Sequence, residues 1–237
     1  MSESHAPSTP LLIIGNKNYS SWSLRPWLAL KVAGVAFDEK LVALFEDDWA
    51  ARKAELPSGT VPVLEHDGNV IWETLAILEY VAETWPDANL WPVDKTARAR
   101  ARTVSSEMHA GFTAVRGNMP MNIRSIDPGR GRGRNADERA AVEHDVRRIE
   151  QIWTECRETY GSGGDFLFGA FSNADAMFAP IVSRFTSYAV EVNPTCQAYM
   201  DAVQALPQMI EWSDAGRAET WVIAEDEVDT IEGKHKD

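Results

Sequence analysis

The sequence has little cysteine, and the cysteine it has is not arranged to bind a metal. Of 237 residues only 2 are cysteines, Cys156 and Cys196, far apart and without a C-x-x-C pair or other metal ligands around them. This spacing fits neither a zinc site nor a disulfide framework. We therefore expect no bound metal, and we expect both thiols to be packing residues in a reducing cytoplasm rather than nucleophiles.

Positive charge is also scarce, and long hydrophobic runs are missing. Lys and Arg number 23 against 36 Asp and Glu, which gives a formal net charge of −13. Such a chain has no bulk attraction to phosphate backbones or anionic lipid, so nucleic acid is not an expected partner. No run of about 18 apolar residues predicts a membrane span. Residues 1–10 lack the cationic start and apolar stretch of a signal peptide, so we expect a frayed tail and a cytoplasmic protein.

The N-terminal region of the chain alternates strand patterns with helix patterns. Apolar runs of strand length, apolar positions at helical spacing and turn residues between them define each element. The expected elements are, in order, a strand at 11–14, a helix at 22–33, a strand at 37–44, a short helix from Asp47 or Asp48, two strands on either side of Asp67-Gly68-Asn69, and a helix from Glu73. The predicted order is β-α-β-α-β-β-α, which is a compact α/β domain.

The C-terminal region of the chain, from about residue 95, shows helical patterns only. A proline-bearing connector, WPDANLWPVDK, separates it from the N-terminal region. The expected helices are 96–121, 136–160, 174–190, 195–206 and 207–219. We therefore predict a second, all-helical domain.

Three short motifs occur in order along these two regions. They are T-V-P-V-L at 60–64, W-E-T-L at 72–75 and F-S-N-A-D at 171–175. With the order of the elements, they make nearly the whole chain resemble the cytosolic glutathione transferases. The resemblance implies an α/β thioredoxin-like N-terminal domain that holds glutathione, an all-α C-terminal domain and a homodimer. We place the domains at 10–86 and 95–222, with flexible tails at 1–9 and 223–237.

The first two motifs imply a glutathione site. In this family the proline follows a cis bond, so Pro62 is expected to turn the backbone of Val61 toward the cysteinyl backbone of glutathione, like an added strand. Glu73 would accept from the ammonium group of the γ-glutamyl residue, and Thr74, with the free N–H groups of the helix, would bind its carboxylate. The alternatives are an ordinary edge-strand proline and a plain threonine N-cap.

The third motif and the glycyl end of glutathione have different interpretations. Ser172 and Asp175 are expected to form a helix capping box and to serve folding rather than catalysis. The contact to the glycyl carboxylate stays open, with Lys53, Arg25 or a backbone donor as candidates.

The stretch S-S-W-S-L-R-P-W at 20–27 lies where this family carries the residue that activates glutathione. It resembles the S-S-C-S stretch of the zeta class, the maleylacetoacetate isomerase group, with Trp22 in the place of the cysteine. The activating hydroxyl hydrogen-bonds the sulfur and favours the nucleophilic thiolate, and the positive N-terminal end of the helix acts in the same direction. We rank Ser20 first, Ser21 second and Tyr19 third, and simple helix capping is the alternative.

The electrophile is expected between the domains, against the helix predicted at 96–121. His109, Phe112, Arg116 and Met119 recur at helical spacing and should share one face. We expect His109 and Arg116 to line the electrophile pocket, with Arg116 pairing with a carboxylate of the substrate. A hydrogen-bonded packing role is the alternative for His109.

The resemblance thus implies a glutathione transferase whose serine-stabilised thiolate adds to a small electrophilic substrate. Conjugation and glutathione-dependent cis-trans isomerisation begin with the same addition, so both agree with the sequence. Glutathione is the co-substrate. Two alternatives use the same scaffold: a non-catalytic binding or regulatory protein, and a glutathione-dependent peroxidase.

Overall fold

A mixed four-stranded sheet forms the N-terminal region of the protein in the computed structural model, which describes residues 8–227. The strands lie in the order β2-β1-β3-β4. β1 (Leu11–Ile14) pairs in parallel with β2 (Asp38–Leu41) and antiparallel with β3 (Val63–His66). β4 (Asn69–Trp72) pairs antiparallel with β3 and forms the outer edge.

The hairpin between β3 and β4 has the predicted tight turn. His66 pairs with Asn69, so Asp67 and Gly68 form the two-residue loop. Both have positive φ, 47° and 75°, as a turn that follows the twist of the strands requires. The Asp-Gly pair therefore sets the register that places Val63 opposite Trp72, at the end of the hairpin near α3.

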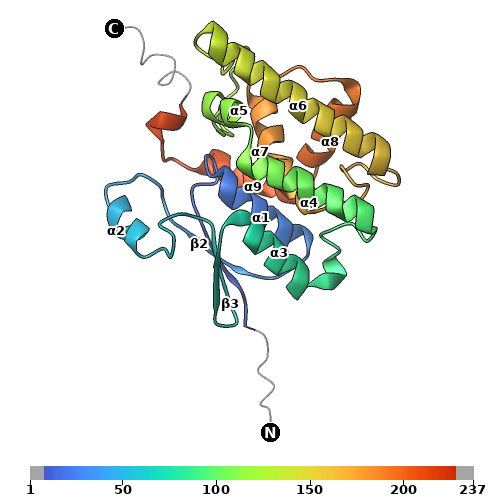
Figure 1. Ribbon diagram of the computed structural model, residues 1–237. Coiled ribbons are helices and arrows are strands. Elements are labelled where there is room, and N and C mark those ends of the chain that lie inside the picture. The colour runs from blue at the N-terminus through green and yellow to red at the C-terminus, as the bar shows by residue number, and fades with distance from the viewer. Residues whose placement is uncertain (1–7, 228–237) are drawn as a thin grey trace, which may run out of the picture.

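Alternate residues of β1 pack on opposite faces of the sheet, as the strand period of two dictates. Leu12 and Ile14 join the main core with α1 (Ser21–Val32) and α3 (Thr74–Thr84), whereas Ile13 joins a second, smaller cluster. α2 (Trp49–Ala54) packs Trp49 on that second cluster and lies apart from α1 and α3 in Figure 1. A short 3₁₀ turn, η1 (Pro86–Ala88), then leads out of the sheet.

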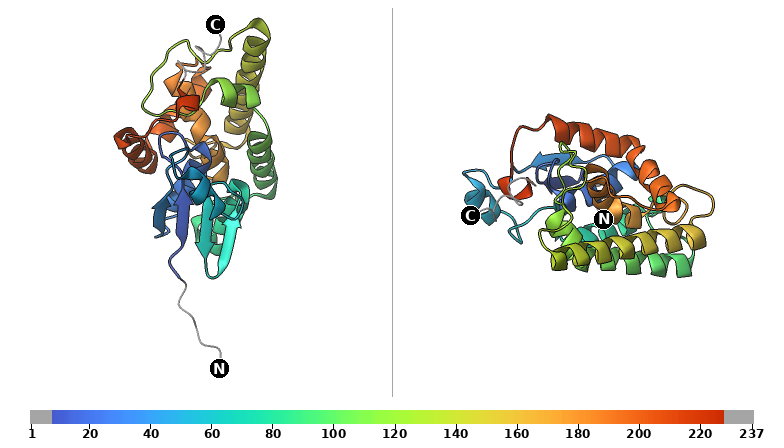
Figure 2. Two further views of the ribbon diagram at one scale, coloured as in Figure 1. Left: turned by 90° about the vertical axis from the view of Figure 1, so that its left-hand side faces the viewer. Right: turned by 90° about the horizontal axis from the view of Figure 1, so that it is seen from above.

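The C-terminal region of the chain is helical and lies on one side of the sheet domain, as the left view of Figure 2 shows. Its helices are α4 (Lys95–Ala110), α5 (Thr113–Asn118), α6 (Ala136–Tyr160), α7 (Asn173–Ser187), α8 (Pro194–Gln204) and α9 (Pro207–Ala218). α7 is buried along almost its whole length and packs against α1. The α1–α7 contact therefore joins the two regions into one core, and the predicted fold class is confirmed.

The capping box predicted before α7 is present. The Ser172 N–H and hydroxyl donate to Asp175 Oδ2 at 2.8 and 2.9 Å, and the Leu167 N–H donates to Asp175 Oδ1 at 3.0 Å. Burial raises the pKa of Asp175 to about 6 despite these donors. Asp175 therefore serves the fold, as expected. Cys156 and Cys196 are likewise buried and unpaired, and burial raises the pKa of both thiols.

The helix predicted at 96–121 is wrong in one respect, because the chain leaves helical geometry at Gly111 and Phe112. Phe112 has a φ of 56°, and a Cβ added to Gly111 would lie 2.8 Å from the carbonyl oxygen of Glu107. α4 therefore ends at Ala110 and a separate short helix, α5, follows. His109 lies on α4 and Arg116 on α5, so the two do not share one face of a continuous helix.

The segment that follows α9 is folded further than the expected tail allows. Ile223 is buried, and residues Ala224–Asp226 form a 3₁₀ turn, η2. The next residue, Glu227, accepts a hydrogen bond from Tyr19. Residues 1–7 and 228–237 of the expected tails lie outside the described residues.

Neither a membrane span nor a metal cluster occurs in the portion of the chain that the structure describes. None of its helices is long and apolar enough to cross a bilayer. Within residues 8–227, no group of three or more His, Cys, Asp and Glu side chains is placed to hold a metal ion.

Candidate active site

Two adjoining cavities lie where the N-terminal end of α1 meets the helical region. The first, of about 330 Å³, is lined by Trp22, Thr60, Val61, Pro62, Glu73, Thr74, His109 and Arg116. The second, of about 400 Å³, shares Trp22, Thr60, Val61 and Arg116 with the first and adds Tyr19, Ser20, Ser21, Lys53, Arg184 and Asp226, among others. Except for Arg25, one of the candidates for the glycyl carboxylate, the residues predicted for binding or catalysis therefore border a single site made of two cavities.

The loop before β3 contributes backbone groups to both cavities. The Val61–Pro62 peptide bond is cis, and regular pairing of β3 begins only at Val63. Among the described residues, none forms a hydrogen bond with the N–H or the C=O of Val61. These two groups are therefore open to pair with an extended ligand backbone.

The start of α3 forms the far wall of the first cavity. Glu73, with a φ of 69°, takes the N-cap position, and no side chain caps the helix. The Thr74 side chain is buried, and its hydroxyl donates to the Trp22 carbonyl at 3.1 Å. The plain threonine cap is therefore not what forms here. The first N–H groups of α3 are left without a side-chain acceptor, which suits an anionic group in the cavity.

His109 and Arg116 lie across the first cavity from Glu73 and Thr74. His109 Nε2 is 3.8 Å from a Glu73 carboxylate oxygen. Arg116 Nη1 donates to the carbonyls of His109 and Gly111 at 3.5 and 3.2 Å, and this guanidinium also borders the second cavity. The pair therefore faces the end expected to hold the γ-glutamyl group, and only Arg116 also reaches the second cavity.

The two candidate serines occupy different environments in the second cavity. Ser20, at 8% exposure, donates its hydroxyl to Ser23 Oγ at 2.7 Å, and Ser23 also accepts from the Gly15 N–H at 3.1 Å. Ser21 is half-buried, and its Oγ accepts from Arg184 Nη2 at 3.4 Å. No residue in 8–227 accepts the hydroxyl hydrogen of Ser21. Of the two hydroxyls, that of Ser21 is the one free to donate into the cavity.

The phenol of Tyr19 is already engaged. It donates to Glu227 Oε1 at 2.6 Å and accepts from Arg124 Nη2 at 2.7 Å. Burial raises the pKa of Tyr19, and the hydrogen bond to Glu227 acts in the same direction. Arg124 also donates to the carbonyls of Glu219 and Trp221 at 2.6 and 2.7 Å. Tyr19 thus ties the C-terminal segment to the turn before α1.

Trp22 forms the wall that the two cavities share. The Arg25 guanidinium lies 4.1 Å from the centre of its ring, and the Arg116 guanidinium lies 5.0 Å from it. The His109 ring packs edge-on at 5.2 Å. The residue in the place of the zeta-class cysteine is therefore a stacking platform for cationic side chains rather than a nucleophile.

Two buried arginines lie at this site: Arg184 was not predicted from the sequence, and Arg25 was predicted only as a candidate for the glycyl carboxylate. Arg25 is 1% exposed and donates to the carbonyls of Met177 and Ser21 at 3.0 and 2.8 Å. Arg184 is 5% exposed. Burial lowers the pKa of Arg25 strongly and that of Arg184 to about 10. An arginine inside an otherwise apolar helical run, as in A-P-I-V-S-R-F, is the sequence feature that could have indicated them.

Of the two side chains considered for binding the glycyl carboxylate of glutathione, Lys53 and Arg25, one remains a candidate. Arg25 is buried beneath Trp22 with its donors on carbonyl groups, and it is not among the residues that line either cavity. Lys53 lines the second cavity, and its Cε would lie 3.1 Å from a Cβ built on Gly59. The structure therefore leaves Lys53 as the side-chain candidate near the Val61 loop.

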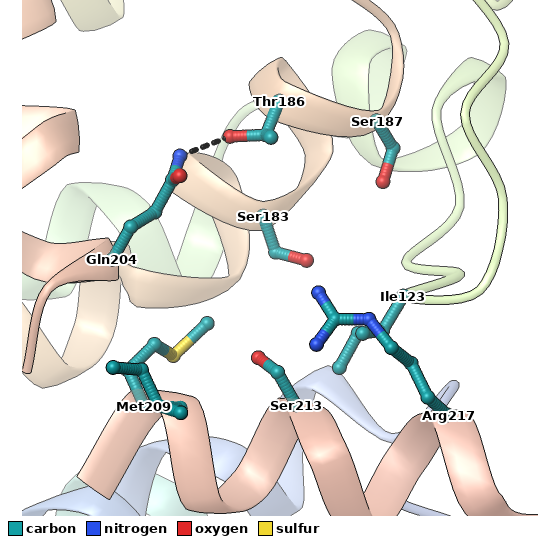
Figure 3. A pocket seen from close by; sticks show the side chains of 9 residues that line it. Ile123, Ser183, Thr186, Ser187, Gln204, Met209, Ser213 and Arg217 are labelled. Atoms are coloured by element: carbon teal, nitrogen blue, oxygen red, sulfur yellow. Dashed lines mark hydrogen bonds between the residues drawn. The ribbon is translucent and has the colours of Figure 1, made fainter. Parts of the chain in front are cut away.

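A smaller cavity of about 140 Å³ lies elsewhere, between α7, α8 and α9 (Figure 3). The side chains of Ser183, Ser213 and Arg217 point toward its centre, and Gln204 donates to Thr186 at its rim. Arg217 pairs with Asp214 at 3.0 Å. This cavity contains none of the predicted binding or catalytic residues, so the two larger adjoining cavities form the candidate site.

Comparisons with known proteins show what this chain is similar to in sequence and fold. Residues 19–84 match the sequence family described as the glutathione S-transferase N-terminal domain. A probable maleylacetoacetate isomerase of Caenorhabditis elegans is 39% identical over 104 residues, which are 44% of this chain and 48% of that protein. The maleylacetoacetate isomerase of Rattus norvegicus is 27% identical over 189 residues, 78% of this chain and 82% of that protein. The N-terminal region of this chain thus matches a glutathione S-transferase domain, and the chain is similar in sequence to maleylacetoacetate isomerases.

Solved structures of glutathione transferases show the same fold. A Burkholderia glutathione transferase homolog with bound glutathione has a TM-score of 0.67 at 20% identity, covering 90% of this chain and 100% of that chain. The tau-class enzyme of mango, Mangifera indica, has a TM-score of 0.69 at 19% identity, covering 90% and 97%. The match to the Caenorhabditis relative spans about half of that protein's length. The solved structures thus show that this chain shares the fold of glutathione transferases.

Proposed function

We propose that this protein is a glutathione transferase that binds glutathione along the two adjoining cavities and presents its thiolate to a small electrophile. One observation carries the proposal. The open backbone of Val61, the uncapped start of α3 at Thr74 and the hydroxyls of Ser20 and Ser21 all border this pair of cavities. These are the groups needed at the cysteinyl backbone, the γ-glutamyl group and the sulfur of one tripeptide.

In the proposed complex, glutathione lies across the loop before β3. Its cysteinyl backbone pairs with the N–H and C=O of Val61, next to Pro62. Its γ-glutamyl carboxylate lies at the α3 N–H groups beside Thr74, and Glu73 accepts from its ammonium group. Lys53 pairs with the glycyl carboxylate. The proposal is supported by a solved homolog with bound glutathione.

The chemistry begins with ionisation of the thiol. Ser20 or Ser21 donates a hydrogen bond to the sulfur, and the N-terminal end of α1 favours the negative charge. Only the thiolate is a good nucleophile, so these groups raise the reactive fraction at neutral pH. The sulfur lone pair forms the S–C bond, and the displaced electron pair leaves with a leaving group or moves to an adjacent atom that takes up a proton.

Cis-trans isomerisation is the specific form of this chemistry that we favour. After addition the former double bond is single and can rotate. Elimination then breaks the S–C bond, restores the double bond and returns the thiolate. Several relatives, in Rattus norvegicus and Rhizobium meliloti among others, are named maleylacetoacetate isomerases, which supports this choice over conjugation alone.

We further propose a cytoplasmic homodimer, on the strength of the family and of the unpaired buried cysteines Cys156 and Cys196. The net charge of −13 argues against a nucleic-acid partner. Size-exclusion chromatography with light scattering tests the dimer, and a monomer at micromolar concentration would contradict it.

The function is tested by calorimetric titration of the full chain with glutathione, followed by conjugation and isomerisation assays on a panel of electrophiles. Variants Ser20→Ala and Ser21→Ala test the hydroxyls, and Ser213→Ala, in the smaller cavity, is the control. We expect binding, turnover and a loss of turnover of about 100-fold or more in the decisive serine variant, because a positioned donor commonly contributes this much. Binding without turnover would leave a non-catalytic binding protein, and no binding would overturn the proposal.

A further inference from the structure

Arg184 reaches the site from the helical region of the protein. It lies on α7, and its guanidinium extends to the first residue of α1. Nε donates to the Met119 carbonyl at 2.7 Å and Nη1 to the Pro180 carbonyl at 3.4 Å. Nη2 donates to Ser21 Oγ at 3.4 Å. Among the described residues, Ser21 is thus the one side-chain hydrogen-bond partner of Arg184, and its hydroxyl is a candidate for binding the sulfur.

The charge of Arg184 is balanced only in part where it lies. No carboxylate in residues 8–227 forms an ion pair with it, and it is 5% exposed. Its charged neighbours are Arg25 and Arg116, which oppose its charge, and Asp226, which favours it. A buried charge that no carboxylate contacts directly is costly, so proteins keep one mainly where an anion is bound or formed.

We propose that Arg184 positions the Ser21 hydroxyl and supplies the fixed positive charge that favours the glutathione thiolate. This inference rests on the proposed function. Because Ser21 Oγ accepts from Arg184, its own hydrogen is directed away from the guanidinium and toward the cavity. The sulfur then receives a hydrogen bond from a hydroxyl that the guanidinium polarises, in a partly buried site where charge acts strongly.

Asp226 is the negatively charged neighbour that offsets the positive charge of Arg184. It enters the second cavity from η2, in the C-terminal segment, and burial raises its pKa to about 6. Arg184 lowers that pKa, whereas the neighbouring Glu225 and Glu227 raise it. Above about pH 6 the Asp226 carboxylate therefore opposes a second negative charge in the cavity. Removing it should favour the thiolate, the reverse of removing Arg184.

The other charged or titratable groups that the structure describes around Ser21 do not bond its hydroxyl. Arg25 donates to the Ser21 carbonyl at 2.8 Å, but from beneath Trp22. Arg116 borders the same cavity with its donors on backbone carbonyls. Tyr19 is engaged by Glu227 and Arg124. Arg184 is therefore the cation that bonds the Ser21 hydroxyl itself.

The test measures ionisation of bound glutathione rather than stability. Ultraviolet absorbance of the thiolate is titrated against pH for the glutathione complexes of the wild type, Arg184→Gln, Arg184→Lys and Asp226→Asn. Arg217→Gln, an exposed arginine in the smaller cavity, is the matched control. We expect Arg184→Gln to raise the thiol pKa by about one unit or more, Arg184→Lys to restore part of the shift, and Asp226→Asn to lower it.

The outcomes separate this inference from the proposed function. If the wild type does not bind glutathione, the proposed function fails. If it binds and ionises glutathione but Arg184→Gln leaves the thiol pKa unchanged, Arg184 only ties Met119 and Pro180, and the inference alone is overturned. If Arg184→Gln does not fold, Asp226→Asn and Arg184→Lys decide, because unchanged thiol pKa values in both would contradict it.

Discussion

Tyr19 and Glu227 lie 208 positions apart in the sequence and share a hydrogen bond of 2.6 Å. The same carboxylate accepts from Asn122 Nδ2 at 3.0 Å, and Glu219 accepts the N–H groups of Lys17 and Asn18 at 2.7 and 3.0 Å. The C-terminal segment thus closes over the turn that carries the candidate serines. This arrangement explains how Asp226 comes to line the second cavity.

We expect Tyr19→Phe to weaken this closure without removing the sulfur partner. Loss of one hydrogen bond to a charged group should cost about 1–3 kcal/mol of stability, measured by denaturant unfolding. Thiolate formation on bound glutathione should stay near the wild-type level. Tyr160→Phe is the control, since no described residue bonds that phenol. A loss of turnover of about 100-fold in Tyr19→Phe would instead make Tyr19 the sulfur partner.

We expect Trp22→Ala to merge the two cavities and to weaken glutathione binding. The ring holds the guanidinium groups of Arg25 and Arg116, and desolvated stacking of this kind contributes about 2 kcal/mol. Calorimetric titration should show a dissociation constant raised by about tenfold or more, which equals about 1.4 kcal/mol. The dissociation constant of Trp22→Phe, which keeps an aromatic face, should lie between those of the wild type and Trp22→Ala. Equal affinity in all three proteins would contradict the role of the platform.

The sequence predicted the fold and most of the residues that border the two cavities, because local patterns determine the elements that carry them. The Asp67-Gly68 turn, the Ser172–Asp175 capping box and the apolar period of α1 are each set by a few neighbouring residues. The break at Gly111 could not be predicted in this way, because it depends on the contact with the Glu107 carbonyl and on the positive φ of Phe112.

Contacts between distant segments account for what the sequence analysis missed in the site. Arg184 meets Ser21 across 163 positions, and no periodicity reveals that contact. The preference for the Ser21 hydroxyl over that of Ser20 depends on which hydrogen is already donated, and only the folded positions of Ser23 and Gly15 show this.

We expect Gly111→Ala to destabilise the protein and Gly117→Ala to leave it unchanged or more stable. The new Cβ at Gly111 would lie 2.8 Å from the Glu107 carbonyl oxygen, which belongs to the backbone and must shift. Overpacking of this kind costs about 1–3 kcal/mol. No atom outside α5's own turn lies within 4 Å of a Cβ at Gly117, where alanine gains up to about 1 kcal/mol of helix propensity. The two variants would show equal shifts in unfolding temperature if the end of α4 at Gly111 did not require a residue without a Cβ.

We expect Asp175 to make stability depend on pH in mildly acidic solution. Its pKa rises from 3.8 to about 6 on folding, so the folded state holds the proton more tightly. The associated stabilisation is full below about pH 4 and is lost as the pH rises through about 6, an effect of about 3 kcal/mol. Unfolding free energies of wild type and Asp175→Asn should therefore differ in slope between these pH values, the variant being flatter. Parallel slopes would show that Asp175 is not protonated in the fold.

We expect Lys53→Ala to weaken binding of glutathione but not of the dipeptide γ-glutamylcysteine, which lacks the glycyl residue. Lys53 lines the second cavity beside Gly59 and Val61, where the glycyl carboxylate is proposed to lie. A partly exposed ion pair contributes up to about 1 kcal/mol, so the glutathione dissociation constant should rise about fivefold. Arg52→Ala is the matched control, because this neighbouring cation pairs with Asp48 and lines a different cavity. If Lys53→Ala weakened both ligands equally, its role would be in the shape of the loop rather than at the carboxylate.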